Sequence, residues 1–217
     1  EEIFLIPEVL MHPTAPSIPI GNVLRADIRS FVVASRIPEP DVPTFGTFVR
    51  APIQQGQAQL IGLVYDIRLQ DDPFLRDLAA SVVEGDPDYE EVIRDQREVR
   101  AVPVEISVVA VAYGDENGYH YGLPPQPPMI LHRIHVCTPD EVRALTSQPD
   151  FLRPLLENRD VPADELITRA LVRAAPLHGA PGSGAYQDYL LQAGRYLARR
   201  LGREPLRLET ILQQLQA

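Results

Sequence analysis

Lysine is absent from this chain of 217 residues, so all 20 of its basic residues are arginine. Without lysine there is no Schiff-base chemistry and no lysine acting as a general base. A nucleotide-binding loop of the Walker type is also excluded, because its lysine is what reaches the terminal phosphates. The missing residue therefore removes several large classes of enzyme from consideration.

Cysteine is almost absent, with Cys137 as the single example. One cysteine excludes an internal disulfide and any zinc site built from several thiolates. A reducing cytoplasm is the compartment this usage predicts, with Cys137 as a buried, inert thiol. No apolar run is long enough for a transmembrane helix, and the first residues lack a basic start followed by an apolar stretch. We therefore expect no membrane insertion.

Positive charge is scarce, and the net charge is −10. Phosphate backbones are bound by clustered cations, so this balance argues against a general nucleic-acid binder. The one basic cluster is RYLARRLGR (Arg195–Arg203), and its helical spacing favours a solvated face that complements a helix C-terminus. A small DNA-contacting patch there stays open as an alternative.

What the chain does contain is a series of short runs rich in valine, isoleucine and phenylalanine between Ile18 and Leu69. Aspartate, proline and glycine separate these runs, as expected for several short strands of one sheet or barrel. Gly21 is placed for close backbone approach or a bulge, and Gly46 and Gly62 for the curvature that closes a small barrel.

The rest of the chain alternates helix and strand signals and then becomes helical. Asp71–Val83 and Asp86–Val99 have helical patterning, whereas Val102–Gly114 reads as a well-buried strand that turns at Asp115–Gly118 into a hairpin. Ile130–Cys137 predicts one more strand, and Thr138, Pro139 and Glu141 form a capping-box signature for the helix that follows. After about Pro149 every segment has helical period.

These signals predict an α+β fold. We expect a small closed β-barrel of about six strands plus an additional hairpin, with inserted helices and a C-terminal helical subdomain. The predicted boundaries are 1–148 for the barrel domain, including an apolar, proline-punctuated N-terminal arm (Glu1–Pro19), and 149–217 for the helical subdomain.

The barrel segments resemble the HAS barrel, the small β-barrel of HerA-type DNA-translocating ATPases and of rotary ATP synthase catalytic-ring subunits. The resemblance rests on IPIGNVLRA, FVVASR and FGTFVRAPIQQGQAQLIGLVYDI and covers about Ile18 to Leu145. The matching positions are Ile20, Gly21, Val23, Gly46, Val49, Leu60, Ile61, Gly62 and Val64. No ATPase module follows, so catalysis is not implied. What the resemblance implies is lateral contact between subunits of a ring, or docking of a partner enzyme such as a nuclease.

The sharpest local motif is HGAPGSGAY (His178–Tyr186), whose Gly179 and Gly184 have the spacing of a phosphate-binding loop. Ala185 and Tyr186 stand where such a loop needs lysine and serine or threonine. Backbone N–H groups could still hold an anion at the helix start. We interpret the segment as an interhelical loop with Ser183 as N-cap.

The remaining polar candidates also have structural interpretations. His132 and His135 are three residues apart and would lie on opposite faces of a strand, which does not make a metal site. His120, between Tyr119 and Tyr121, is either a satisfied hairpin histidine or part of a small polar pocket. The two acidic pairs fit helix caps better than acid–base chemistry; they are Asp71/Asp72 and Glu90/Glu91.

We therefore assign no catalytic, cofactor-binding or metal-ligating residue. The sequence predicts a non-enzymatic protein–protein interaction or assembly module, a subunit or accessory factor of a larger complex, with a homo-oligomer as one option. Its expected contact surfaces are the N-terminal arm and the apolar stripe of the last helix: Leu206, Leu208, Ile211, Leu212 and Leu215. Two alternatives are an accessory or degenerate partner of a HerA-like ATPase that contacts DNA through arginine, and an enzyme with a pocket near His120 and Tyr121.

Overall fold

The computed structural model describes residues 18–36, 43–69 and 103–216. Three groups of predictions lie outside these residues: most of the N-terminal arm with His12, the two helices at 71–83 and 86–99, and the acidic pairs within them.

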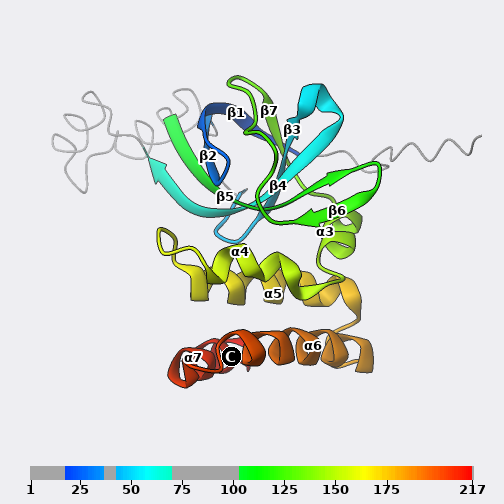
Figure 1. Ribbon diagram of the computed structural model, residues 1–217. Coiled ribbons are helices and arrows are strands. Elements are labelled where there is room, and N and C mark those ends of the chain that lie inside the picture. Colours follow the sequence, from blue (N-terminus) through cyan, green and yellow to red (C-terminus); the bar gives the residue numbers. More distant parts are fainter. Residues whose placement is uncertain (1–17, 37–42, 70–102, 217) are drawn as a thin grey trace, which may run out of the picture.

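Within these residues seven strands form one antiparallel sheet, and six of them close into a barrel (Figure 1). The strands are β1 (Pro19–Ala26), β2 (Ser30–Arg36), β3 (Phe48–Ile53), β4 (Ala58–Leu69), β5 (Pro103–Asp115), β6 (Gly118–Tyr121) and β7 (Arg133–Val136). Their order is β2-β1-β7-β3-β4-β5-β6, and an additional β2–β5 pairing closes the ring, leaving β6 as an extra strand beside β5. The predicted α+β fold with a small closed barrel and an additional hairpin is therefore confirmed.

Two of the three strand glycines act as the sequence predicts. Gly21 has φ +145° at a register shift of β1, and a Cβ there would meet the Ala34 carbonyl oxygen of β2. Gly62 sits at a register shift between β4 and β5, where a Cβ would meet the Val108 side chain. Gly46 differs: it lies in the turn before β3 with φ +77°, a left-handed conformation that glycine adopts without strain.

The barrel has a core on each side of its longest strands. Along β5, Val108 and Ala110 belong to the barrel interior, whereas Val109 and Val111 belong to a second cluster shared with the helices. Burial on both faces explains why this strand reads as a continuous apolar run and not as an alternating one.

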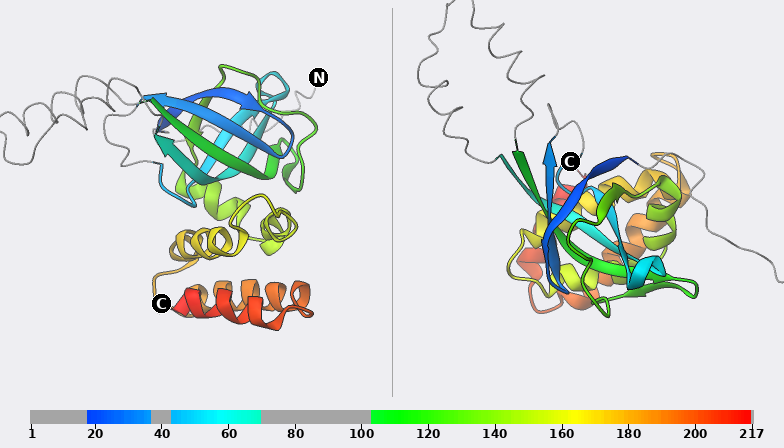
Figure 2. Two further views of the ribbon diagram at one scale, coloured as in Figure 1. Left: turned by 90° about the vertical axis from the view of Figure 1, so that its left-hand side faces the viewer. Right: turned by 90° about the horizontal axis from the view of Figure 1, so that it is seen from above.

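The helices cover the outer face of β3, β4 and β5 in two successive layers (Figures 1 and 2). They are α3 (Pro139–Leu145), α4 (Arg153–Leu156), α5 (Ala163–His178), α6 (Gly184–Arg200) and α7 (Pro205–Gln216), with short 3₁₀ turns η1 (Gln54–Gly56) and η2 (Pro149–Leu152). The second cluster runs from Phe48 and Leu63 on the barrel through Phe151 to Leu171 and Ile211 on the helices. A continuous core thus crosses the predicted domain boundary at 148/149.

Thr138 caps α3 as expected: its hydroxyl accepts from the Glu141 N–H, and the Glu141 carboxylate accepts from the Thr138 N–H at 2.7 Å. The preceding strand is shorter than predicted, because β7 begins only at Arg133. Residues 130–132 form a turn instead, in which Leu131 has φ +68°. A left-handed residue breaks the extended backbone that a strand requires.

Candidate interaction surface

A turn of exposed apolar residues precedes β7. The backbone N–H of His132 donates to the Met129 carbonyl at 3.1 Å, which closes a four-residue turn with Leu131 at its left-handed position. Met129, Ile130 and Leu131 are 65%, 63% and 77% exposed. Three consecutive large apolar side chains therefore face solvent at one place.

Leu131 is an unusual residue for its backbone conformation. Positive φ favours glycine or asparagine, and a leucine there costs about 1 kcal/mol. The turn is nonetheless held on both sides: the Leu131 N–H donates to the Val23 carbonyl at 2.8 Å, and the Val23 N–H donates to the His132 carbonyl at 2.9 Å. The apolar tip is thus fixed to the barrel wall by the backbone of β1.

β1 contributes a fourth exposed apolar side chain next to this turn. The pairing of β1 with β2 shifts register between Val23 and Arg25, so Leu24 is the extra residue of a bulge. Val23 is buried in the barrel, whereas Leu24 is 41% exposed. We call the four residues Leu24, Met129, Ile130 and Leu131 the turn surface. The β3–β4 hairpin and the segment leading into β7 lie at the side of the barrel away from α5, α6 and α7 (Figure 1).

The sequence did not predict this surface, because residues 130–137 have the apolar pattern of a single strand. The available signal was the run Met129–Leu131, three large apolar residues in a row without alternation directly after the proline-rich connector. A half-buried strand would show period two.

Two arginines, Arg25 and Arg133, follow residues of the turn surface in the sequence. Arg133 is exposed and lies opposite Asn22 in the β1–β7 register. Arg25 donates to the Glu105 carboxylate at 2.8 Å, and its side chain is still 58% exposed. The hydrogen bond to Glu105, followed by the Coulomb attraction, raises the pKa of Arg25, which stays charged at any physiological pH.

A polar cluster that begins at Arg50 on β3 joins the barrel to α3. Arg50 Nε lies 3.3 Å from the Glu141 carboxylate, and both side chains are 15% exposed. Burial lowers the pKa of His135, and the positive charges of Arg50 and Arg133 lower it further. Burial also raises the pKa of the Cys137 thiol well above its usual value. A buried thiol that resists ionisation is a poor nucleophile. The cluster holds β3, β7 and α3 together.

His120 belongs to the β5–β6 hairpin. Its Nε2 lies 3.0 Å from the Asp115 carboxylate, and its ring stacks on Tyr113 at 4.8 Å between centroids. The hydrogen bond from the Asn117 backbone N–H lowers the pKa of Asp115, and the hydrogen bond with His120 lowers it to a smaller extent. Tyr121 donates to the Leu145 carbonyl at 2.8 Å. These contacts favour the interpretation of a satisfied hairpin histidine.

The glycine-rich segment after α5 is an interhelical loop whose Ser183 caps α6, accepting from the Tyr186 N–H at 3.3 Å. His178 is the last residue of α5; its ring stacks on Tyr189 at 4.1 Å, and Nε2 lies 2.9 Å from the Thr146 hydroxyl. That hydroxyl donates to the Val142 carbonyl, so the imidazole N–H is the donor to it. The histidine is thereby engaged in helix packing.

The other two histidines in the described residues do not gather into a site. His132 lies in the turn before β7, not on the strand, and its Nδ1 is 3.3 Å from the Pro52 carbonyl, whereas His135 lies within β7. Among residues 18–36, 43–69 and 103–216, no three or more histidine, cysteine or acidic side chains form a group that could hold a metal. In the same residues, no helix has the length and apolarity that crossing a bilayer requires.

The apolar stripe of the last helix is used within the chain. Ile211 is fully buried, and Leu208 and Leu215 pack against the same core, while Leu206 and Leu212 are 78% and 36% exposed. The expected assembly surface is therefore largely the contact of α7 with its own helical layer. On α6, Arg195, Arg199 and Arg200 are exposed, consistent with a solvated face.

The comparisons with known proteins add no assignment to this geometry. The chain matches no protein-family model and no curated protein.

Proposed function

We propose that this chain is a non-enzymatic protein-interaction module that serves as a subunit or accessory factor of a larger assembly, and that the turn surface is its contact site. The observation that carries the proposal is the left-handed backbone of Leu131, the last of three consecutive exposed apolar residues. A conformation that costs stability, held rigid so that it presents apolar atoms to water, is typical of a binding site.

The HAS-barrel resemblance belongs to the same proposal. A closed six-stranded barrel is compatible with it, and in this interpretation the barrel acts without an ATPase module. The alternative role, contact with DNA through arginine, predicts binding that weakens as salt rises; no DNA binding at low salt would exclude it.

Capture from a lysate of the native cell tests the proposal. We would compare the full chain with the double variant Ile130→Asp/Leu131→Asp, and use Leu206→Asp as matched control because Leu206 is equally exposed on another element. Quantitative mass spectrometry should find proteins retained by the wild type and by Leu206→Asp but lost from the double variant. Identical sets from all three would reject the turn surface as the contact site.

A further inference from the structure

We infer that the turn surface binds an acidic, apolar peptide segment of a partner protein. This inference rests on the proposed function and adds the chemistry of the partner. It starts from two segments, residues 18–26 and 128–136, which contain two arginines, Arg25 and Arg133, and no aspartate or glutamate. The neighbouring acids have partners of their own: Glu105 contacts Arg25, and Asp27 accepts from the backbone of Arg29 and Ser30. The whole chain has 30 acidic residues against 20 arginines, so this region is an exception.

Arg133 is placed to contact a bound carboxylate. It is the first residue of β7, directly after the turn, and lies opposite Asn22 of β1 with its side chain exposed. No ion pair joins Arg133 to another described residue. Arg25 lies next to Leu24 on β1; its guanidinium contacts Glu105, and its side chain as a whole is 58% exposed. Guanidinium groups bind carboxylates with paired N–H donors.

The apolar part of the surface is suited to a peptide side chain and is rigid before binding. Leu131 is tied to Val23 through the backbone, and the bulge directs Leu24 outward from the same strand. A preformed apolar contact loses little conformational entropy on binding, which leaves more of the contact energy as affinity.

Other occupants fit less well. A second copy bound about a twofold axis would present the same arginine-bearing segments from both sides, with no acidic residue in them to pair with Arg133. An anionic bilayer would meet a chain with net charge −10, and two arginines offer little attraction against that. A basic peptide would be repelled by Arg25 and Arg133 themselves.

The probe is a random peptide display library selected on the full chain, with counter-selection on Leu131→Gly. We expect the enriched peptides to combine large apolar side chains with aspartate or glutamate. Turn-dependent peptides that are uncharged or basic would overturn this inference and leave the proposed function standing. If no peptide depends on Leu131, the inference fails, while the lysate capture decides the proposed function separately.

A charge-swap cycle on one enriched peptide, followed by fluorescence anisotropy, tests the arginine. Arg133→Glu should weaken binding about five- to tenfold, as expected for the loss of a single charge pair that is only partly shielded from solvent. The peptide with its acid changed to lysine should recover affinity for Arg133→Glu. Arg195→Glu on α6 is the matched control and should change little. Equal loss with both variants, or no recovery by the swapped peptide, would contradict a direct contact.

Two further measurements examine the other occupants. Light scattering of the wild type and Leu131→Gly reports a turn-dependent dimer, and co-sedimentation with phosphatidylserine/phosphatidylcholine vesicles reports turn-dependent membrane binding. We expect neither. Either result would overturn the peptide assignment.

Discussion

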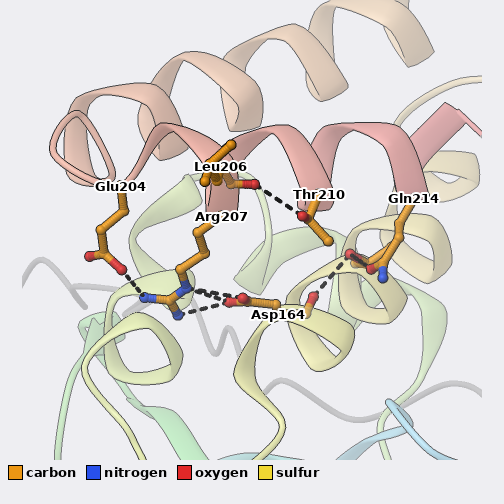
Figure 3. A network of polar contacts seen from close by, with 7 residues as sticks. Asp164, Glu204, Leu206, Arg207, Thr210 and Gln214 are labelled. Atoms are coloured by element: carbon orange, nitrogen blue, oxygen red, sulfur yellow. Dashed lines mark hydrogen bonds and ion pairs between the residues drawn. The ribbon is translucent and has the colours of Figure 1, made fainter.

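Arg207 of α7 holds the carboxylate of Asp164 on α5 with a two-pronged contact. Its Nε is 2.8 Å from Oδ1 and 3.0 Å from Oδ2, and a second nitrogen of the guanidinium is 2.7 Å from Oδ1 (Figure 3). Glu204 accepts from the same guanidinium at 3.3 Å. The hydrogen bond that Arg207 donates to Asp164 is the main cause that raises the pKa of Arg207, and the negative charge of Asp164 adds to it. The pair fixes the start of the last helix against the first turn of α5.

Arg207→Ala should therefore lower the free energy of unfolding. Both side chains are 26% exposed, so solvent screens the pair only in part, and we expect a loss of about 1 kcal/mol. Chemical denaturation followed by circular dichroism measures it. Arg203→Ala, an exposed arginine in the preceding loop, is the control and should leave the midpoint unchanged. Equal midpoints for both variants would mean that the pair contributes nothing.

The buried residue of α7 supplies a second prediction. Ile211→Ala removes methyl groups from a fully buried site and should cost about 2–4 kcal/mol, whereas Leu206→Ala, at 78% exposure, should cost a few tenths. Thermal or urea unfolding of the two variants compares them directly. Deletion of Pro205–Ala217 would then destabilise the chain itself, so weaker assembly after that deletion would not identify a contact surface. Similar losses from both substitutions would contradict the packing of α7.

The sequence predicts the barrel, and it predicts the apolar stripe of α7, but it does not predict what that stripe packs against. The short β-type runs and their separating glycines predict the closed barrel because period, turn residues and glycine placement all act locally. The stripe of α7 predicts an apolar face equally well. Nothing local says whether Ile211 packs on its own chain or on another, since that depends on where α5 and α6 lie.

The turn surface could not be predicted for a related reason. Ile130 and Ile134 favour strands and Leu131 continues the apolar run, so the local signal extends β7 by several residues. The strand begins only after Leu131, whose left-handed backbone is held by the hydrogen bond of its N–H to the Val23 carbonyl, more than a hundred residues earlier in the chain. A contact so distant in sequence is not visible in the local pattern.

Leu131→Gly gives a third prediction, in which stability and binding change in opposite directions. Glycine adopts positive φ without strain but raises the entropy of the unfolded chain, so we expect a net gain of about 0.5 kcal/mol in the free energy of unfolding. The same variant should lose the binding described above. Denaturant titration and peptide anisotropy measure the two effects. A clear loss of stability would show that the Leu131 side chain supports the fold instead of presenting a contact.

His178 provides the fourth prediction, a pH dependence of stability. Burial, and to a smaller extent the charge of Arg143, lowers the pKa of His178 below its usual value near 6.5. Between the unfolded and folded pKa values the unfolded chain binds the extra proton, so acid favours unfolding. The contribution is fully present above about pH 6.5 and is lost as the pH falls through the lowered, folded pKa.

His178→Gln isolates this effect, because glutamine can keep the donor to Thr146 and a planar group against Tyr189 without titrating in this range. From about pH 7 to about pH 5, the free energy of unfolding should fall less in the variant than in the wild type. His135 also has a lowered pKa, so part of the slope should remain until His135→Gln is added. The ring-proton resonance that disappears in His178→Gln should titrate below the usual pH in the wild type. A normal titration of that resonance, together with an unchanged slope, would show that the imidazole is hydrated and not enclosed between α3 and α6.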